Sequence, residues 1–191
     1  MTKTEKYELF RKTADIPRTG WLTRGIAAPE SVAAHMHGCF LLAYFLLPEA
    51  APGDGYDKKT VLQMLLLHDL GEAVTGDIPR PQKATDPARY DREEDEAIKN
   101  TLLSGEADEA PLWEAWREQK TPEARIAKDI DDLQAIHTFC EYCLREPACF
   151  PAEDRRHWLA GLAHLRTPQG RALAKTLLED NERFRSLLAG R

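Results

Sequence analysis

The chain contains the apolar run Val61-Leu62-Gln63-Met64-Leu65-Leu66-Leu67-His68-Asp69, which ends in two ionisable residues. Its composition predicts a helix that is buried almost all round. His68 and Asp69 would be costly to desolvate at the end of such a segment unless something pairs with them. We expect that partner to be a bound metal ion, and the alternative is a hydrogen-bonded core histidine.

Apolar residues recur every three or four positions over most of the 191 residues, and no stretch alternates like a strand. We therefore predict an all-α fold, with residues 1–191 forming a single domain. A turn is expected at 51–56 and a loop at 80–90. The expected helices are 29–48, 57–76 (carrying His68, Asp69 and Glu72), 87–103, 111–120, 121–144, 152–164 and 168–189.

Composition excludes several classes of protein. A net charge of -6, with no long block of Lys and Arg, argues against nucleic-acid polymers as partners. No segment reaches the length of a membrane span, and the first residues lack the apolar core of a signal peptide, so we expect a cytoplasmic protein without a membrane partner. The four cysteines, Cys39, Cys140, Cys143 and Cys149, are interpreted as reduced core thiols rather than a disulfide framework or a zinc site.

Further metal ligands must come from other helices. His35 is the upstream candidate, because it is one of few polar groups in an apolar helix, and His37 is its rival on nearly the opposite face. Downstream the candidate is Asp131, with Asp129 and Asp132 as rivals. Two histidines and two aspartates with open positions suit a divalent ion such as Co, Mn, Fe, Ni, Zn or Mg.

The order His35, His68-Asp69, Asp131 resembles the signature of HD-domain metal-dependent phosphohydrolases. The resemblance extends over about residues 8–145 and is closest to the 5'-deoxynucleotidase branch. It implies a helical HD-domain bundle with the metal in its core, completed by C-terminal helices within 152–189. The landmarks are 17–21 (PRTGW), 29–32 (PESV), Glu72, 76–78 (GDI), 92–94 (REE), 112–114 (LWE), 123–124 (EA) and Lys128.

No histidine lies between Asp69 and Asp131. Dinuclear HD enzymes place further histidines in that interval to hold a second ion, so we expect a mononuclear site. The remaining histidines, His37, His137, His157 and His164, are assigned to the core or the surface.

Three residues are candidates for catalysis. Glu72 lies one helical turn from His68 and could move a proton to or from water, or could orient a ligand. Asp77 lies in a Gly-Asp-Ile-Pro turn, where it could bind a sugar hydroxyl, donate a proton to the leaving oxygen or stabilise the turn. Arg18 offers a planar fork for phosphate. The resemblance implies nucleoside contacts from Asp77, Ile78, Pro79 and Arg80.

Two further residues are candidates for substrate binding. Trp21 could form a flat wall for a sugar or base. It is separated from Arg18 by Thr19-Gly20, whereas the two are adjacent in bacterial deoxynucleotidases and separated in the eukaryotic-like members. Glu123 could contact substrate or a partner subunit, or could simply stabilise its helix dipole.

These features together predict a metal-dependent phosphomonoesterase that hydrolyses (deoxy)ribonucleoside 5'-monophosphates to nucleoside and phosphate. The alternatives are hydrolysis of another small phosphate, such as a nucleoside triphosphate or a sugar phosphate, and a nucleotide-binding HD protein without turnover. The resemblance also implies a homodimer.

Overall fold

A computed structural model of the chain describes residues 1–50, 55–104 and 109–189. Over these residues the all-α prediction is confirmed, since the only strand-like pairing is one isolated antiparallel bridge between Pro17 and Ser31. None of the described helices has the length and apolar character needed to cross a membrane. The α-helices are α1 (Lys3–Phe10), α2 (Thr19–Leu22), α3 (Val32–Leu46), α4 (Lys58–Leu67), α5 (Glu72–Thr75), α6 (Arg80–Lys83), α7 (Pro87–Asn100), α8 (Ala110–Glu118), α9 (Pro122–Arg145), α10 (Ala152–Ala160), α11 (Pro168–Ala174) and α12 (Arg185–Leu188).

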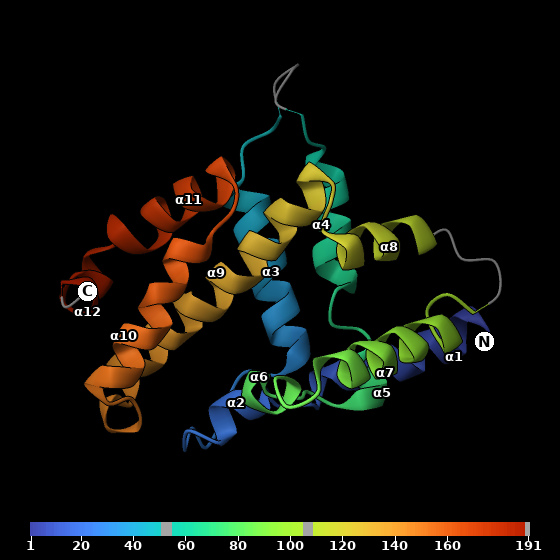
Figure 1. The fold of residues 1–191 in the computed structure, drawn as a ribbon, viewed down its shortest axis with the longest axis horizontal. Helices are drawn as coiled ribbons and strands as arrows, with labels where there is room; N and C mark the ends of the chain where they lie inside the picture. The colour runs from blue at the N-terminus through green and yellow to red at the C-terminus, as the bar shows by residue number, and fades with distance from the viewer. Residues whose placement is uncertain (51–54, 105–108, 190–191) are drawn as a thin grey trace.

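The long helix α9 is the centre of the fold (Figure 1). Its start is set by Thr121, whose side chain accepts a hydrogen bond from Ala124 N, and by Pro122 in the first turn. Helices α3, α4, α8 and α11 all pack against it. Its buried residues, among them Ile130 and Leu133, therefore join one hydrophobic cluster with residues of α3 and α4.

Helices α3 and α4 pack on α9 and on each other; α3 contains His35, and His68 and Asp69 directly follow α4. Ser31 caps α3 by accepting a hydrogen bond from Ala34 N, and Asp57 caps α4 by accepting from Lys59 N and Thr60 N. The turn expected between them falls partly on residues 51–54, which lie outside the described residues.

The single helix expected over 57–76 is wrong. Helix α4 ends at Leu67, Asp69 lies in a turn, and Glu72 begins the separate helix α5. The ring nitrogen Nδ1 of His68 donates to Leu65 O at 2.9 Å, and the next backbone bonds span three residues, which tightens the chain and ends the α-helical pattern.

Other expected boundaries also differ. Residues 80–90, expected as a loop, contain α6, and no helix was predicted over α1, which contains no buried residue. The expected C-terminal helices are each divided. Helix α10 continues as a 3-10 turn (Gly161–His164), and α11 is followed by a π-helical turn (Lys175–Glu179), a 3-10 turn (Glu182–Phe184) and α12.

Asp129 joins α9 to the C-terminal segment. Its buried carboxylate accepts hydrogen bonds from Arg166 N, Thr167 N and Thr167 Oγ1 at 2.6–3.0 Å. Thr167 in turn caps α11 through Gly170 N. Asp129 is therefore engaged in holding α11 against α9.

Candidate metal centre

Four side-chain atoms from three segments converge beside α9. His35 Nε2 lies 3.4 Å from His68 Nε2, 3.6 Å from Asp69 Oδ2 and 2.9 Å from Asp131 Oδ1. His68 Nε2 lies 3.4 Å from Asp69 Oδ2 and 3.7 Å from Asp131 Oδ1. Ligands bound at about 2.1 Å to a tetrahedral ion are about 3.4 Å apart, so this spacing fits one divalent cation.

The turn that follows α4 orients two of these donors, His68 and Asp69. Because Leu65 O can only accept, His68 Nδ1 carries the proton of that hydrogen bond and Nε2 has a free lone pair. Both histidines are buried, while the side chains of Asp69 and Asp131 are 16% and 11% exposed. A bound cation would therefore be reached from solvent on its carboxylate side.

The rival ligands lie elsewhere. His37 is exposed, Asp129 holds the C-terminal segment, and Asp132 pairs with Arg80 and Lys128. Cys39 was not anticipated as part of the site, although it lies one turn after His35. Its buried Sγ is 3.8 Å from His35 Nε2 and belongs to the same group of potential donors as His35, His68 and Asp131.

Positive charge compensates the carboxylates of the site. Burial by itself would raise the pKa of Asp131, but the Lys128 ammonium, together with the neighbouring His35 and His68 side chains, holds that pKa well below its usual range. Lys128 Nζ lies 2.6 Å from Asp131 Oδ2. Asp131 is therefore ionised. Its Oδ1 faces His35, and its Oδ2 faces Lys128.

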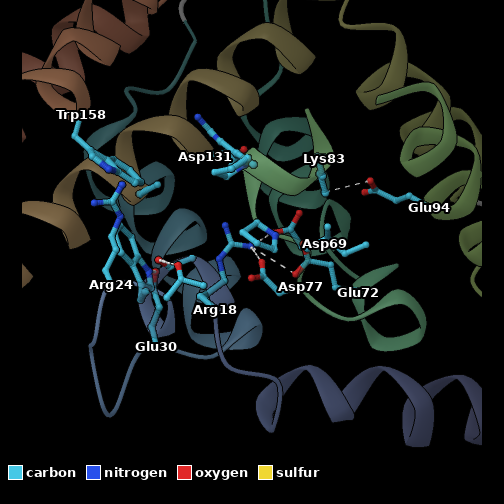
Figure 2. A pocket seen from close by; sticks show the side chains of 18 of the residues that line it. Arg18, Arg24, Glu30, Asp69, Glu72, Asp77, Lys83, Glu94, Asp131 and Trp158 are labelled. Atoms are coloured by element: carbon cyan, nitrogen blue, oxygen red, sulfur yellow. Dashed lines mark hydrogen bonds and ion pairs between the residues drawn. The ribbon is translucent and has the colours of Figure 1, made fainter. Parts of the chain in front are cut away.

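A cavity of about 380 Å³ opens over this group. Figure 2 shows Arg24 and Trp158 at one side of the cavity, Lys83 and Glu94 at the other, and Arg18 and Asp131 between them. The cavity is large enough for a small ligand. Of the candidate site residues, Arg18, Trp21, Asp69, Glu72, Asp77, Ile78, Pro79, Arg80 and Asp131 line it, whereas His35 and His68 lie behind the carboxylates.

Arg18 lies among three carboxylates. Its Nη1 is 3.1 Å from Asp69 Oδ2, 3.5 Å from Glu72 Oε2 and 2.9 Å from Asp77 Oδ1. Burial opposes the charge of the guanidinium, but these carboxylates outweigh burial and raise the pKa of Arg18. One nitrogen is thus used to hold the acidic cluster together, while a guanidinium has further N–H donors for a ligand.

Glu72 is the least satisfied carboxyl group of the site. It is 3% exposed, and its Oε2 accepts no hydrogen bond among the described residues. Burial and the neighbouring charge of Asp69 raise the pKa of Glu72 to about 10, against the lowering effect of Arg18. Its Oε2 has the ion pair with Arg18 at 3.5 Å but no hydrogen bond from the described residues.

Asp77 binds the start of α2. Its Oδ2 accepts from Thr19 N at 2.6 Å and from Thr19 Oγ1 at 2.5 Å, and its Oδ1 pairs with Arg18. These contacts were not anticipated. They show Asp77 fixing the position of Arg18 on the cavity wall.

Trp21 is mainly a core residue. It is 4% exposed, its ring stacks on Trp158 at 5.0 Å, and its Nε1 donates to Glu30 Oε1. Trp158, which also lines the cavity, was not among the predicted site residues, because nothing in the sequence links the C-terminal segment to Trp21.

Glu123 is not among the residues that line the cavity. Its Oε1 accepts a hydrogen bond from Asp57 N at 2.9 Å, next to the start of α4. This contact favours a structural role, one of the alternatives that the sequence left open.

The chain belongs to the HD domain family, whose model matches residues 11–157. It is 35% identical over 144 residues to "5'-deoxynucleotidase HDDC2" of Dictyostelium discoideum, covering 72% of this chain and 76% of that one. It is 30% identical to the protein of the same name from Danio rerio, covering 92% and 84%. A solved structure titled "Conserved hypothetical protein from Pyrococcus furiosus" superposes with a TM-score of 0.76 at 28% identity, covering 92% of this chain and 96% of that one.

Proposed function

We propose that this protein is a metal-dependent 5'-nucleotidase that hydrolyses nucleoside 5'-monophosphates to nucleoside and phosphate. The observation that carries the proposal is one cavity that combines the Asp69 and Asp131 carboxylates of the four-donor group, cationic side chains that include Arg18 and Lys128, and Glu72, whose Oε2 accepts no hydrogen bond from the described residues. The family supports hydrolytic chemistry, and the names of the two relatives support the choice of substrate.

We assign His35, His68, Asp69 and Asp131 as ligands of a single divalent ion. No further histidine lies between Asp69 and Asp131 to hold a second ion. When bound, such an ion polarises a phosphoryl oxygen and lowers the pKa of water. The donor set leaves Co, Mn, Fe, Ni, Zn and Mg open.

Arg18 and Lys128 are placed to bind the phosphate. Both line the cavity next to Asp69 and Asp131, and both are anchored by carboxylates that keep them charged. Asp77 positions Arg18, and its remaining lone pairs can accept from a sugar hydroxyl. These contacts stabilise the charge that spreads over the phosphoryl oxygens during transfer.

Glu72 transfers a proton in the reaction, either from the attacking water or to the leaving oxygen. In hydrolysis, a bond forms between water oxygen and phosphorus, the ester P–O bond breaks, the attacking water loses a proton and the leaving 5' oxygen gains one. Glu72 lines the cavity next to Arg18, and its Oε2, which has no hydrogen bond to the described residues, can hydrogen-bond either water or the leaving oxygen.

The nucleoside occupies the part of the cavity away from the donors. Ile78, Pro79 and Trp158 supply apolar surface to the cavity, and Arg24 Cζ lies 5.8 Å from the centre of the Trp158 ring. We propose deoxynucleotides as the preferred substrates, in line with the names of the relatives.

Phosphate release tests this function. The protein is stripped with a chelator, reloaded with Co or Mn, and assayed on dNMPs, NMPs, dNTPs and sugar phosphates. We expect the monophosphates to be hydrolysed fastest and the stripped protein to be inactive. Faster release from triphosphates or sugar phosphates would replace the substrate class. Saturable dNMP binding without release would show a nucleotide-binding protein.

We also propose a cytoplasmic homodimer. Large apolar side chains are exposed on α3 and at the end of α4, among them Leu41, Tyr44, Phe45 and Leu66. Light scattering should give twice the mass of the chain, and Phe45→Glu should lower that mass. A monomeric wild type would refute the dimer without affecting the proposed activity.

A further inference from the structure

A buried polar network lies behind His35, between α3 and α9. We propose that Gln134 is a positioning residue, held in one orientation by Glu30, which keeps His35 protonated on Nδ1 and so presents Nε2 to the metal. The proposal rests on the metal site assigned above. It extends that site to residues that touch neither the ion nor the reacting atoms.

The orientation of the Gln134 amide follows from its neighbours. Its Nε2 donates to Glu30 Oε2 at 3.1 Å and to Thr138 Oγ1 at 3.0 Å. A carboxylate cannot donate, so the NH₂ end of the amide must face Glu30. The carbonyl end, Oε1, then faces His35 Nδ1 at 2.5 Å.

The orientation of the amide fixes the tautomer of His35. An amide oxygen only accepts, so the proton between the two groups belongs to Nδ1 of His35. The lone pair of a neutral imidazole is then on Nε2, which faces His68, Asp69 and Asp131. His68 reaches the same state through Leu65 O. The two histidines thus use different acceptors for one purpose.

Gly38 makes room for this network. A Cβ atom at Gly38 would lie 2.8 Å from Gln134 Nε2 and 3.2–3.3 Å from its Cγ and Cδ. Gly38 lies in the middle of α3, where glycine costs about 1 kcal/mol relative to alanine. The close approach of Gln134 explains why alanine, the better helix former, does not fit there.

Glu30 links this network to the cavity. Its Oε1 accepts from Trp21 Nε1 at 3.2 Å, and both residues line the cavity, where Glu30 lies on the same side as Arg24 (Figure 2). The backbone N of Glu30 also donates to the Tyr142 hydroxyl. Glu30 is therefore fixed from two sides, and this lets its carboxylate hold the NH₂ group of Gln134 in one orientation.

The test compares Gln134→Met, which keeps the length of the side chain but cannot hydrogen-bond, with Gln63→Met at an exposed position of α4. Cobalt affinity is measured by competition with a chelator, using the visible absorption of the bound ion. The tautomer of His35 is read by long-range ¹H–¹⁵N NMR of the zinc-loaded protein. We expect Gln134→Met to weaken cobalt binding about 10- to 100-fold, with Gln63→Met unchanged.

Two more variants test the network from other sides and cover a failure of Gln134→Met to fold. Gly38→Ala should push the amide off His35 and weaken cobalt binding in the same direction. Glu30→Gln replaces the carboxylate with an amide that can also donate, so the orientation of the Gln134 amide is no longer fixed. We expect a smaller loss of cobalt affinity and a mixture of His35 tautomers.

The inference is overturned if cobalt affinity is unchanged in the folded variants, or if NMR shows Nδ1 of His35 unprotonated in the wild type. A wild type that binds no cobalt would refute both this inference and the metal site. A wild type that binds cobalt but releases no phosphate would refute the proposed function alone.

Discussion

Glu72 begins α5 with a buried carboxyl group whose Oε2 has no hydrogen-bond partner among the described residues. It is not one of the assigned metal donors. Its contribution should therefore be separable from metal binding, unlike that of the four ligands.

Glu72→Gln should lower kcat about 10²- to 10⁴-fold on a dNMP substrate, because glutamine fills the same space but cannot transfer a proton. Elemental analysis should show an unchanged metal content. Glu94→Gln is the matched control, since Glu94 also lines the cavity but pairs with Lys83. Glu72→Gln activity within tenfold of the wild type would remove Glu72 from the proton transfer.

At this scale the sequence separated some candidates and not others. His35 was preferred as one of few polar groups in an apolar helix, with His37 on nearly the opposite face, and the structure places His37 in solvent. Asp129, Asp131 and Asp132 share one helix, and spacing alone could not rank them. The roles of Asp129 and Asp132 depend on Thr167 and Arg80, which are distant in sequence.

Among the elements, α9 connects the metal centre to the C-terminal segment. Asp131 faces the cavity, and Asp129, two residues earlier, holds Arg166 and Thr167. The same helix thus places Asp131 at the cavity and uses Asp129 to hold the C-terminal segment.

Asp129→Ala should destabilise the protein by about 2–4 kcal/mol, because three buried or half-buried donors of Arg166 and Thr167 lose their acceptor. Urea unfolding measures this loss. Asp132→Ala, at a partly exposed ion pair with Arg80, should cost less than about 1 kcal/mol. Equal losses in the two variants would contradict the anchoring role of Asp129.

Asp95 holds α7 against α8 through Trp113 and Arg117 of α8, and it also pairs with Lys99. Burial raises the pKa of Asp95, but the hydrogen bonds and charges of these partners outweigh it, so the pKa lies below 3.8. A lowered folded pKa contributes stability that is present above the unfolded value and is lost as the pH falls through the folded value.

The wild type should therefore exceed Asp95→Asn in unfolding free energy by about 1–2 kcal/mol at pH 6. This difference should shrink as the pH falls below 3.8. Urea unfolding of both proteins across this range measures it, and effects on the metal ligands cancel in the comparison. A difference that grows toward low pH would have the wrong sign.

The break after α4 shows what the sequence could not provide at this scale. Periodicity indicated the apolar face of 61–67 and the positions of His68 and Glu72, but a helix and a helix followed by a tight turn have the same pattern there. In the structure the His68 ring donates to Leu65 O, and the backbone bonds that follow span three residues. That turn brings Asp69 Oδ2 within 3.4 Å of His68 Nε2.

Across the whole molecule, the all-α class could be predicted from the spacing of apolar residues, and the metal signature from the order of its motifs. The full set of residues that line the cavity could not be predicted, because Trp158, which stacks on Trp21, lies in a segment without any motif. The prediction of one domain for residues 1–191 would be tested by a single cooperative unfolding transition.

The central claim is that one ion, held by His35, His68, Asp69 and Asp131, is required for phosphate release. The most direct measurement determines metal content and dNMP hydrolysis on the same samples of wild type and Asp131→Ala. We predict about one ion per chain and hydrolysis in the wild type, and neither in the variant. Hydrolysis that persists in a metal-free Asp131→Ala protein would contradict the claim.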